Sequence, residues 1–466
     1  MGLDSRHAPE PALFVVRRKL WKNLEKSTGL TGLSGQMFSN ILIDMNPLIA
    51  FQNVTLIDGT GREPASDSTV IVRNGKIIYA GLTKNRPASS ERTITLDLRG
   101  KYLLPGLIDC HVHLSGSGEV DSQFKVDDGS MTLKILDNAR KNLAAGITTV
   151  RDLGGWNELE FAVRRAIQHG EFSGSRMVLA GRFISITESG ADYYEGMYRM
   201  ADGLEEVRKA VREQIRNGAD LIKLGVTGAV LVEDGVPGAT HFNSDEIRVA
   251  VEEAAKFGRR VAAHAHGIDG IRKAVQAGVH SIEHGTFLHQ GPDVIEEMAK
   301  RGIFLVPTLK AGWDVIEGDT SKVPQWIIDK SLPIQDDSVK SLKMAYEAGV
   351  PIAMGSDAAT PLNFHGENGL EIYWMGQTGM RPMDALVSST LTAAKALGWD
   401  SWLGSLEAGK AADLLIMDEN PLEDLRRLAD KKLIRAVFLN GKLAARQPMD
   451  NYPEETLAKD CLSVGN

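Results

Sequence analysis

Hydrophobic and polar positions change their rhythm twice along the chain. Between residues 45 and 104, short apolar runs alternate with turn residues, and Asn74-Gly75 between two such runs predicts a β-hairpin. From residue 107 the pattern becomes strand, loop and helix, repeated. The apolar segments that predict parallel strands are LIDCHVH, TTVRDLG, RMVLAG, LIKLGV, RVAAHAH, SIEHG, FLVPTL and IAMGSD. After them the chain returns to short strands, in GSLEAGKAADLLIMDENPL and IRAVFLNGKLA.

Helical patterns lie between most of these apolar segments. Examples are LEEVRKAVREQIRNG, SDEIRVAVEEAAKFG and GIRKAVQAG, each of which ends at a glycine, as helices prefer. Eight strands that alternate with helices over about 290 residues have the count and length of a (β/α)8 TIM-type barrel. A doubly wound open sheet is the alternative, but no Gly-rich dinucleotide turn follows the first strand. We therefore expect an α/β fold in which a (β/α)8 barrel is inserted in a small, discontinuous β-sandwich domain.

This pattern divides the chain into four zones. Residues 1–44 form an N-terminal extension whose basic amphipathic stretch, LFVVRRKLWKNLEK, is expected to dock on the protein itself or on a sister subunit rather than on a membrane. The small β-sandwich domain takes residues 45–104 together with 404–447. Residues 105–403 form the barrel, and 448–466 a C-terminal tail.

Composition narrows the class of protein further. The chain has 466 residues, of which 43% are hydrophobic and 24% charged, as in ordinary soluble globular proteins. A net charge of −8 argues against nucleic acid as the main partner. The chain has two cysteines, Cys110 and Cys461. So few cysteines argue against a scaffold built on disulfides and favour a cytoplasmic location. No apolar run approaches the ~18 residues that span a bilayer, and the N-terminus lacks a signal-peptide pattern.

Polar residues recur where the predicted barrel strands end. His111 and His113 close the first strand, and strand alternation places both on one face. The other candidates are Lys223 within the fourth strand, His264 near the end of the fifth, His284 at the end of the sixth and Asp357 at the end of the eighth. Active sites of such barrels are built at the carboxyl ends of the strands. We therefore expect these six side chains to converge on one point.

Each of these residues alone has a structural explanation. A lone strand histidine is more often a satisfied core residue, Lys223 could extend to solvent, and Asp357 could cap a helix. Together, four imidazoles and a carboxylate would be costly to bury unless they bind a metal such as zinc, manganese, iron or cobalt. A protonated Lys223 would be repelled by such ions. Reaction of its neutral amine with carbon dioxide would instead give an anionic carbamate that can bridge two metals.

Several segments carry a family resemblance over roughly residues 48 to 445. They are LLPGLIDCHVHL, GADLIKL, VAAHAHG, SIEHG, GSDA and LGSLEAGKAADLLIMDENPLEDL. In these motifs the chain resembles the amidohydrolase superfamily, in its binuclear imidazolonepropionase-like and prolidase-like branch. Cousins in this branch include hydrolases of phenylurea and thiocarbamate herbicides.

The resemblance implies a site with two divalent ions, zinc first, with manganese, iron or cobalt as alternatives. His111 and His113 would bind the more buried ion, and His264 and His284 the more exposed one. Lys223, as N6-carboxylysine, would bridge the pair. Asp357 would complete the first site and serve as the catalytic acid–base group for attack by a metal-bound hydroxide.

Two departures from peptidase-like relatives bear on the substrate. SITESGADYYEG, after the third strand, lacks their Gly-Gly-His type segment, and GVTGAVLVEDG has no tyrosine or arginine suited to a terminal carboxylate. We therefore expect hydrolysis of an amide, urea or carbamate C–N bond in a small, neutral, partly aromatic or apolar molecule, with phenylurea and thiocarbamate herbicides as candidates. The candidate substrate contacts are His266, Glu188 and Tyr193. We also expect a cytoplasmic homo-oligomer that binds neither nucleic acid nor membrane.

Three other functions stay open at the level of sequence. The first is an Xaa-Pro-type dipeptidase or N-acyl amino acid hydrolase. The second, a mononuclear deaminase, would not need Lys223 and often has a glutamate soon after the fifth-strand histidine, where this chain has His264-Ala-His-Gly. The third, a non-catalytic binding protein on the same fold, should have lost ligands, whereas all six are present.

Overall fold

The computed structural model of the protein describes residues 47–119, 126–188 and 194–446. The predicted extension, the predicted C-terminal tail, Tyr193 and Cys461 lie outside these residues. Among the described residues, no helix is long and apolar enough to cross a membrane.

The chain divides into two compact units. One comprises residues 1–48 and 89–94, and the other residues 49–88 and 95–466. The barrel and the site described below lie entirely in the second unit. The domain boundaries expected from the sequence, near residues 104 and 404, stay predictions.

The short strands form one eight-stranded sheet. They are β1 (Leu48–Leu56), β2 (Ala65–Arg73), β3 (Lys76–Leu82), β4 (Thr93–Asp97), β5 (Tyr102–Pro105), β15 (Leu414–Met417), β16 (Ile434–Leu439) and β17 (Lys442–Arg446). Their order is β17-β16-β15-β5-β1-β2-β3, and β4 pairs with β1. Asn74 and Gly75 have φ of 50° and 75° and form the predicted hairpin between β2 and β3. Antiparallel pairing of β15 with β5 joins the C-terminal strands to this sheet, which confirms the discontinuous β domain.

The predicted barrel is present, and seven of its eight segments are strands. They are β6 (Leu107–Val112), β7 (Ile147–Asp152), β8 (Arg176–Leu179), β11 (Leu221–Gly225), β12 (Arg260–Ala265), β13 (Ser281–His284) and β14 (Phe304–Val306). Two further short strands, β9 (Phe183–Ser185) and β10 (Tyr198–Met200), extend the sheet beside β11. All strand pairs within the barrel are parallel.

The eighth segment, IAMGSD, closes the ring without forming a regular strand. Its contacts are isolated parallel bridges, Leu305 with Ile352 on one side and Val112 with Ala358 on the other. Gly355 explains how closely it approaches β6, because a Cβ there would lie 2.8 Å from the Cβ of His111. The eighth predicted strand is therefore a short closing segment, and the barrel class is confirmed.

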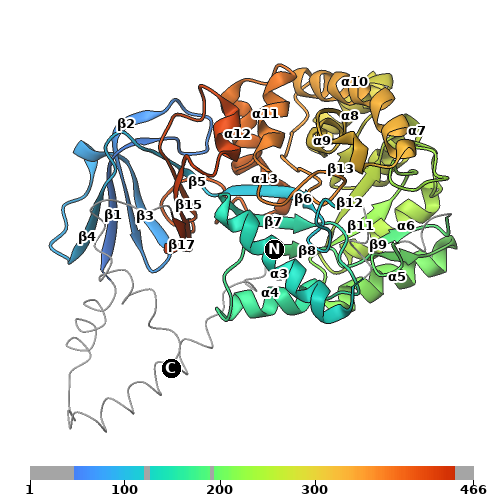
Figure 1. The fold of residues 1–466 in the computed structure, drawn as a ribbon, viewed down its shortest axis with the longest axis horizontal. Coiled ribbons are helices and arrows are strands. Elements are labelled where there is room, and N and C mark those ends of the chain that lie inside the picture. Colours follow the sequence, from blue (N-terminus) through green and yellow to red (C-terminus); the bar gives the residue numbers. More distant parts are fainter. Residues whose placement is uncertain (1–46, 120–125, 189–193, 447–466) are drawn as a thin grey trace, which may run out of the picture. The chain divides into compact units, whose positions relative to one another are not determined.

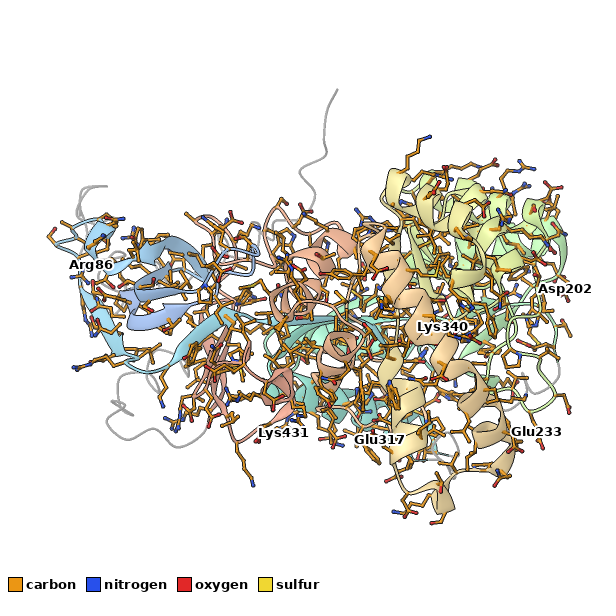
Figure 2. All side chains as sticks on the ribbon, turned by 90° about the horizontal axis from the view of Figure 1, so that it is seen from above. Arg86, Asp202, Glu233, Glu317, Lys340 and Lys431 are labelled. Atoms are coloured by element: carbon orange, nitrogen blue, oxygen red, sulfur yellow. The ribbon has the colours of Figure 1, made fainter. Side chains whose placement is uncertain are left out.

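Helices surround the barrel strands (Figure 1). They are α3 (Asp128–Ala144), α4 (Glu160–Gln168), α5 (Gly203–Asn217), α6 (Ser244–Ala255), α7 (Ile268–Ala277), α8 (Pro292–Arg301), α9 (Leu309–Glu317), α10 (Gln325–Glu347), α11 (Leu370–Gln377), α12 (Pro382–Ser388) and α13 (Leu391–Leu397). As predicted, α5 and α7 end at glycines in the left-handed conformation, Gly218 and Gly278. Figure 2 labels exposed charged residues on loops and outer helix faces, among them Asp202 and Lys340.

The connection after β14 departs from the simple repeat. It carries two helices, α9 and the 23-residue α10, which has Pro333 in its interior. Residues of both helices line the cavity at the carboxyl ends of the barrel strands. The sequence pattern did not predict that these two helices would line the site.

Candidate active site

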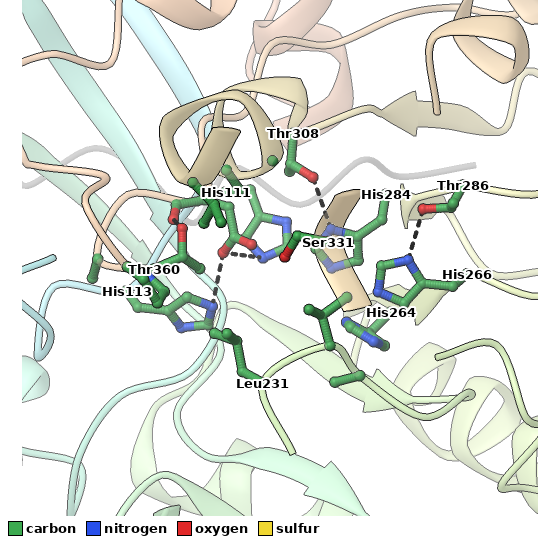
Figure 3. A pocket seen from close by; sticks show the side chains of 18 of the residues that line it. His111, His113, Leu231, His264, His266, His284, Thr286, Thr308, Ser331 and Thr360 are labelled. Atoms are coloured by element: carbon green, nitrogen blue, oxygen red, sulfur yellow. Dashed lines mark hydrogen bonds and ion pairs between the residues drawn. The ribbon is translucent and has the colours of Figure 1, made fainter. Parts of the chain in front are cut away.

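The six predicted ligands line one cavity at the carboxyl ends of the barrel strands (Figure 3). They are His111, His113, Lys223, His264, His284 and Asp357. The first five come from β6, β11, β12 and β13 or the residue that follows, and Asp357 comes from the closing segment. Five of the six are buried, and His113 is 16% exposed. The structure therefore brings together all the residues that the strand-end pattern selected.

Three residues at the carboxyl ends of these strands have left-handed backbone conformations. His284, Thr308 and Asp357 have φ of 70°, 52° and 56°. Such conformations are uncommon for residues other than glycine, and they concentrate at functional sites. At His284 the consequence is direct, because two consecutive residues, Glu283 and His284, both contribute to the site. Simple strand alternation would have placed them on opposite faces.

Asp357 lies between the two histidines of β6. Its Oδ1 is 3.4 Å from the Nε2 of His111 and 3.3 Å from the Nε2 of His113. Backbone bonds hold the loop, since the Asp357 N–H donates to the His111 carbonyl at 2.8 Å and Asn363 Nδ2 donates to the Asp357 carbonyl at 2.9 Å. Lys223 Nζ lies 3.4 Å from His111 Nε2. One carboxylate oxygen, one amine and two imidazoles thus face a common point.

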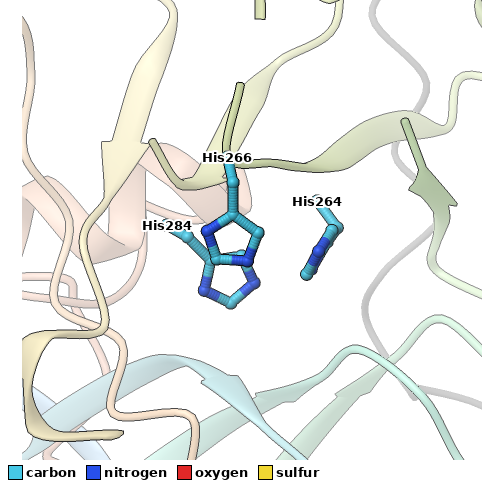
Figure 4. Close-up of side chains that lie close together, drawn as sticks. All are labelled: His264, His266 and His284. Carbon is cyan, nitrogen blue, oxygen red and sulfur yellow. The ribbon is translucent and has the colours of Figure 1, made fainter. Parts of the chain in front are cut away.

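His264 and His284 form the other half of the cluster, together with His266 (Figure 4). Their ring centroids are 4.4 Å apart, and His266 stacks on His284 at 4.7 Å with an interplanar angle of 15°. The Nδ1 of His284 lies 2.8 Å from Thr308 Oγ1, and the Nδ1 of His266 lies 2.7 Å from Thr286 Oγ1. Each threonine hydroxyl holds one ring nitrogen, which leaves Nε2 facing the cavity.

Burial sets the protonation of these groups. It lowers the pKa of His111 to about 4 and the pKa values of His264 and His284 well below the usual range. Burial likewise lowers the pKa of Lys223 to about 8. Burial alone would raise the pKa of Asp357, but the neighbouring His111 and His113 outweigh it and lower that pKa to about 2. Neutral imidazoles and an ionised carboxylate are the forms that bind metals.

The donor set fits divalent metal ions on a direct observation of this structure. Within the described part of the chain, His264 Nε2, His284 Nε2 and Asp357 Oδ1 are buried atoms without a hydrogen-bond partner. Buried polar atoms almost always have a hydrogen-bond partner. Three buried atoms that lack one and face the same cavity therefore indicate a ligand site. Imidazole nitrogen and carboxylate oxygen suit zinc and its first-row neighbours.

Two residues behind His111 were missed by the sequence analysis. His111 Nδ1 lies 3.0 Å from Glu283 Oε2, and Arg151 Nη2 donates to both Glu283 oxygens at 2.9 and 3.0 Å. Glu283 and Arg151 are both buried. A carboxylate on Nδ1 fixes the tautomer whose Nε2 faces the cavity. The only sequence signal was a charged residue beside His284 in SIEHG.

Replacing Glu283 with glutamine should therefore weaken metal binding while the ring of His111 stays in place. The glutamine amide has one accepting oxygen and one donating nitrogen, so it cannot accept hydrogen bonds with both polar atoms as the carboxylate does. The tautomer of His111 that carries its proton on Nε2 therefore becomes populated. Loss of such a partner typically costs about 10- to 100-fold in metal affinity or activity. Metal titration of the metal-free variant, monitored by calorimetry, measures the effect.

Glu253→Gln is the matched control. Glu253 is also a buried carboxylate held by cations, Arg212 and Lys256, but it lies on α6, and none of these three is among the described residues that line the cavity. This variant should lose thermal stability and keep the wild-type metal affinity. Equal metal affinities for Glu283→Gln and the wild type would show that Glu283 serves the fold alone.

The remaining predicted substrate contacts have different positions. His266 lines the cavity. Glu188 is not among the described lining residues. Its carboxylate accepts a hydrogen bond from Ser185 Oγ at 2.9 Å and lies 3.7 Å from His241 Nε2. Tyr193 is outside the described residues, but the nearby Tyr194 and Tyr198 do line the cavity. The contact predicted for Tyr193 therefore stays a prediction.

Comparison with known proteins agrees with this architecture. Residues 102–444 match the model of the amidohydrolase family. Ochratoxinase from Aspergillus niger is 31% identical over 420 residues, covering 83% of this chain and 85% of that protein. A crystal structure of an Xaa-Pro dipeptidase with bound methionine is 32% identical with a TM-score of 0.77, covering 85% of this chain and 99% of that one. Phenylurea hydrolase B, 22% identical with a TM-score of 0.69 over 86% of this chain and 99% of that one, shares the fold.

Proposed function

The chain belongs to the amidohydrolase family, and on this basis we propose that it hydrolyses an amide, urea or carbamate C–N bond of a small, neutral, partly aromatic or apolar molecule. Leaving the substrate aside, the chain is a metal-dependent amidohydrolase of the ochratoxinase- and prolidase-like branch. The observation that carries the proposal is the set of unpartnered nitrogen and oxygen atoms that converge on the cavity.

We assign the metal ligands as the sequence predicted. His111, His113 and Asp357 would hold one divalent ion, and His264 and His284 a second. Lys223, with its pKa lowered by burial, supplies the neutral amine that carboxylation requires, and the resulting carbamate would bridge both ions. When bound, the ion pair would lower the pKa of water and polarise the scissile carbonyl.

The protein side of the reaction then falls to Asp357. Its Oδ1 faces the cavity between His111 and His113, where it can accept a proton from the attacking water. Water oxygen bonds to the carbonyl carbon, the C–N bond breaks, and the same proton passes from Asp357 to the leaving nitrogen. The products are an amine and a carboxylic or carbamic acid. Asn363 and the His111 carbonyl bind the backbone of Asp357 and so hold the loop that carries the carboxylate.

The walls of the cavity support a neutral substrate. Of the described lining residues, Lys223 is the only lysine or arginine, and it lies among the proposed ligands. Phe183, Tyr194 and Tyr198 supply aromatic surface on one side, and Phe183 stacks on Tyr198 at 4.9 Å. The apolar lining also includes Leu231, Val315, Ile327 and Ile334. A free carboxylate would be desolvated against these walls without a matching cation.

We therefore expect neutral aryl substrates to be preferred over dipeptides. The kcat/KM for 4-nitroacetanilide or a phenylurea should exceed the value for Ala-Pro by more than about tenfold, because an unpaired carboxylate is costly to bury. Initial rates with the zinc-, manganese- and cobalt-loaded protein on a panel of anilides, ureas, carbamates, N-acyl amino acids and dipeptides measure this difference.

The same panel decides against the main alternative. If Ala-Pro or an N-acyl amino acid is hydrolysed faster than every neutral aryl compound, the protein is a dipeptidase or acylase, in line with its likeness to an Xaa-Pro dipeptidase structure. Failure of all classes with a fully metal-loaded protein would leave the hydrolase family correct and the proposed substrate class wrong.

A further inference from the structure

Helix α10 buries several uncharged polar residues on its inner face, while charged residues such as Asp336 and Lys340 are exposed. Ser331, Gln335 and Ser338 lie at helical spacing, are buried to 6%, 5% and 9% exposure, and line the cavity. The opposite face carries Leu332, which is 49% exposed, and Lys340 (Figure 2). A helix of this kind normally turns its apolar stripe inward. The buried polar residues therefore need an explanation in the cavity itself.

Two of the three polar side chains retain unused hydrogen-bonding capacity. Ser338 Oγ is engaged, because it donates to the Ile334 carbonyl at 3.1 Å and contacts Thr286 Oγ1 at 3.3 Å. Gln335 makes one long contact, from its Nε2 to the Leu309 carbonyl at 3.3 Å. Within the described part of the chain, Ser331 Oγ and Gln335 Oε1 have no partner in the structure. Figure 3 shows Ser331 among the side chains that line the cavity.

Helix α9 makes room for the glutamine. A Cβ at Gly312 would lie 1.9 Å from Gln335 Oε1. Gly312 and Gln335 both line the cavity, so the missing side chain lets the amide oxygen lie against α9 at the wall of the cavity. Any larger residue at position 312 would displace Gln335.

We propose that Ser331 and Gln335 form a subsite for a neutral hydrogen-bonding group of the substrate, such as an amide, located beside its apolar part. A buried amide oxygen can accept an N–H, and a buried hydroxyl can donate to a carbonyl oxygen, so the pair matches both ends of a secondary amide. Among the described residues that line the cavity, Lys223 is the only lysine or arginine, and it belongs to the proposed metal ligands, which argues against a carboxylate as the preferred partner of this subsite. The inference rests on the proposed function and specifies the substrate further.

A matched pair of anilides tests the subsite. N-acetylphenylalanine 4-nitroanilide and 2-benzylpentanoic acid 4-nitroanilide share the scissile bond, the benzyl group and the overall size, but the second replaces the acetamido group by propyl. We expect the wild-type kcat/KM to be about tenfold higher for the acetamido compound, the value of one buried hydrogen bond. Gln335→Met, which keeps the length of the side chain, should reduce this ratio to below about threefold.

Ser331→Ala is the second variant, and it should lower the same ratio. Gln325→Met is the matched control, because Gln325 lies on the same helix but is exposed and bonds only Asp329 at 2.9 Å. Equal wild-type rates on the two anilides, or an unchanged ratio in both subsite variants, would overturn the subsite. If the wild type cleaves neither anilide, the proposed function fails instead, which separates the two conclusions.

Discussion

Replacing Lys223 with alanine should lower kcat/KM by more than about 10³-fold and reduce bound metal, since the bridging group and the activated water would be lost together. Lys223 is 1% exposed, and its Nζ lies 3.4 Å from His111 Nε2. A lysine buried beside a metal pair is tolerable only when its charge is removed or reversed. Carboxylation achieves this, because the new N–C bond to carbon dioxide forms with loss of a proton and leaves an anion.

Chemical rescue tests this assignment. Formate, acetate or propionate should restore part of the activity of Lys223→Ala, because a short carboxylate can occupy the vacated bridging place. Lys223→Met fills the same space, so it should be equally inactive and show no rescue. A ¹³C carbamate signal after incubation with labelled bicarbonate should appear in the wild type alone. Full activity and metal content in Lys223→Ala would refute the carbamate.

Replacing Asp357 with asparagine should lower kcat by at least about 10²-fold, the usual contribution of a general acid–base group. Asp357 has a φ of 56°, and asparagine tolerates this left-handed conformation nearly as well as aspartate. The backbone bonds to His111 and Asn363 do not involve the side chain of Asp357, so they should survive. The variant should thus fold and keep most of its metal while it loses the proton acceptor.

Asp357→Ala is the comparison that separates chemistry from backbone strain. Alanine also lacks the proton acceptor, but it is less tolerant of a positive φ, and its melting temperature should fall below that of the asparagine variant. Thermal unfolding and metal analysis should be run on both variants beside kinetics. Turnover of Asp357→Asn within threefold of the wild type would mean that this residue only organises the loop.

Local patterns of the sequence predict much of this architecture. Runs such as LIKLGV and RVAAHAH predicted strands that the structure contains, and Asn74-Gly75 predicted the observed hairpin. Strand alternation also placed His111 and His113 on one face, and both line the cavity. These features depend on residues that are close in sequence, so periodicity and turn chemistry are enough to predict them.

The tertiary structure alone decided which distant groups meet. Arg151, Glu283 and His111 come from three strands, and no local pattern links them. His284 and Asp357 have left-handed φ values that no local pattern predicts, and both side chains line the cavity. The segment IAMGSD was predicted as a full strand, but it forms isolated bridges. The barrel closes at this segment, where Gly355 allows a close approach to β6.

Helix α10 shows most clearly where the sequence reaches its limit. Its polar residues alone cannot distinguish a solvated helix face from one that lines a cavity, since both consist of hydrogen-bonding side chains. Packing against α9 and the carboxyl ends of the strands buries Ser331 and Gln335 and exposes Leu332. The sequence by itself determined the barrel, the β domain and the cluster of candidate ligands. Which walls enclose that cluster was decided by long-range packing, because burial is a property of neighbours that the local pattern does not contain.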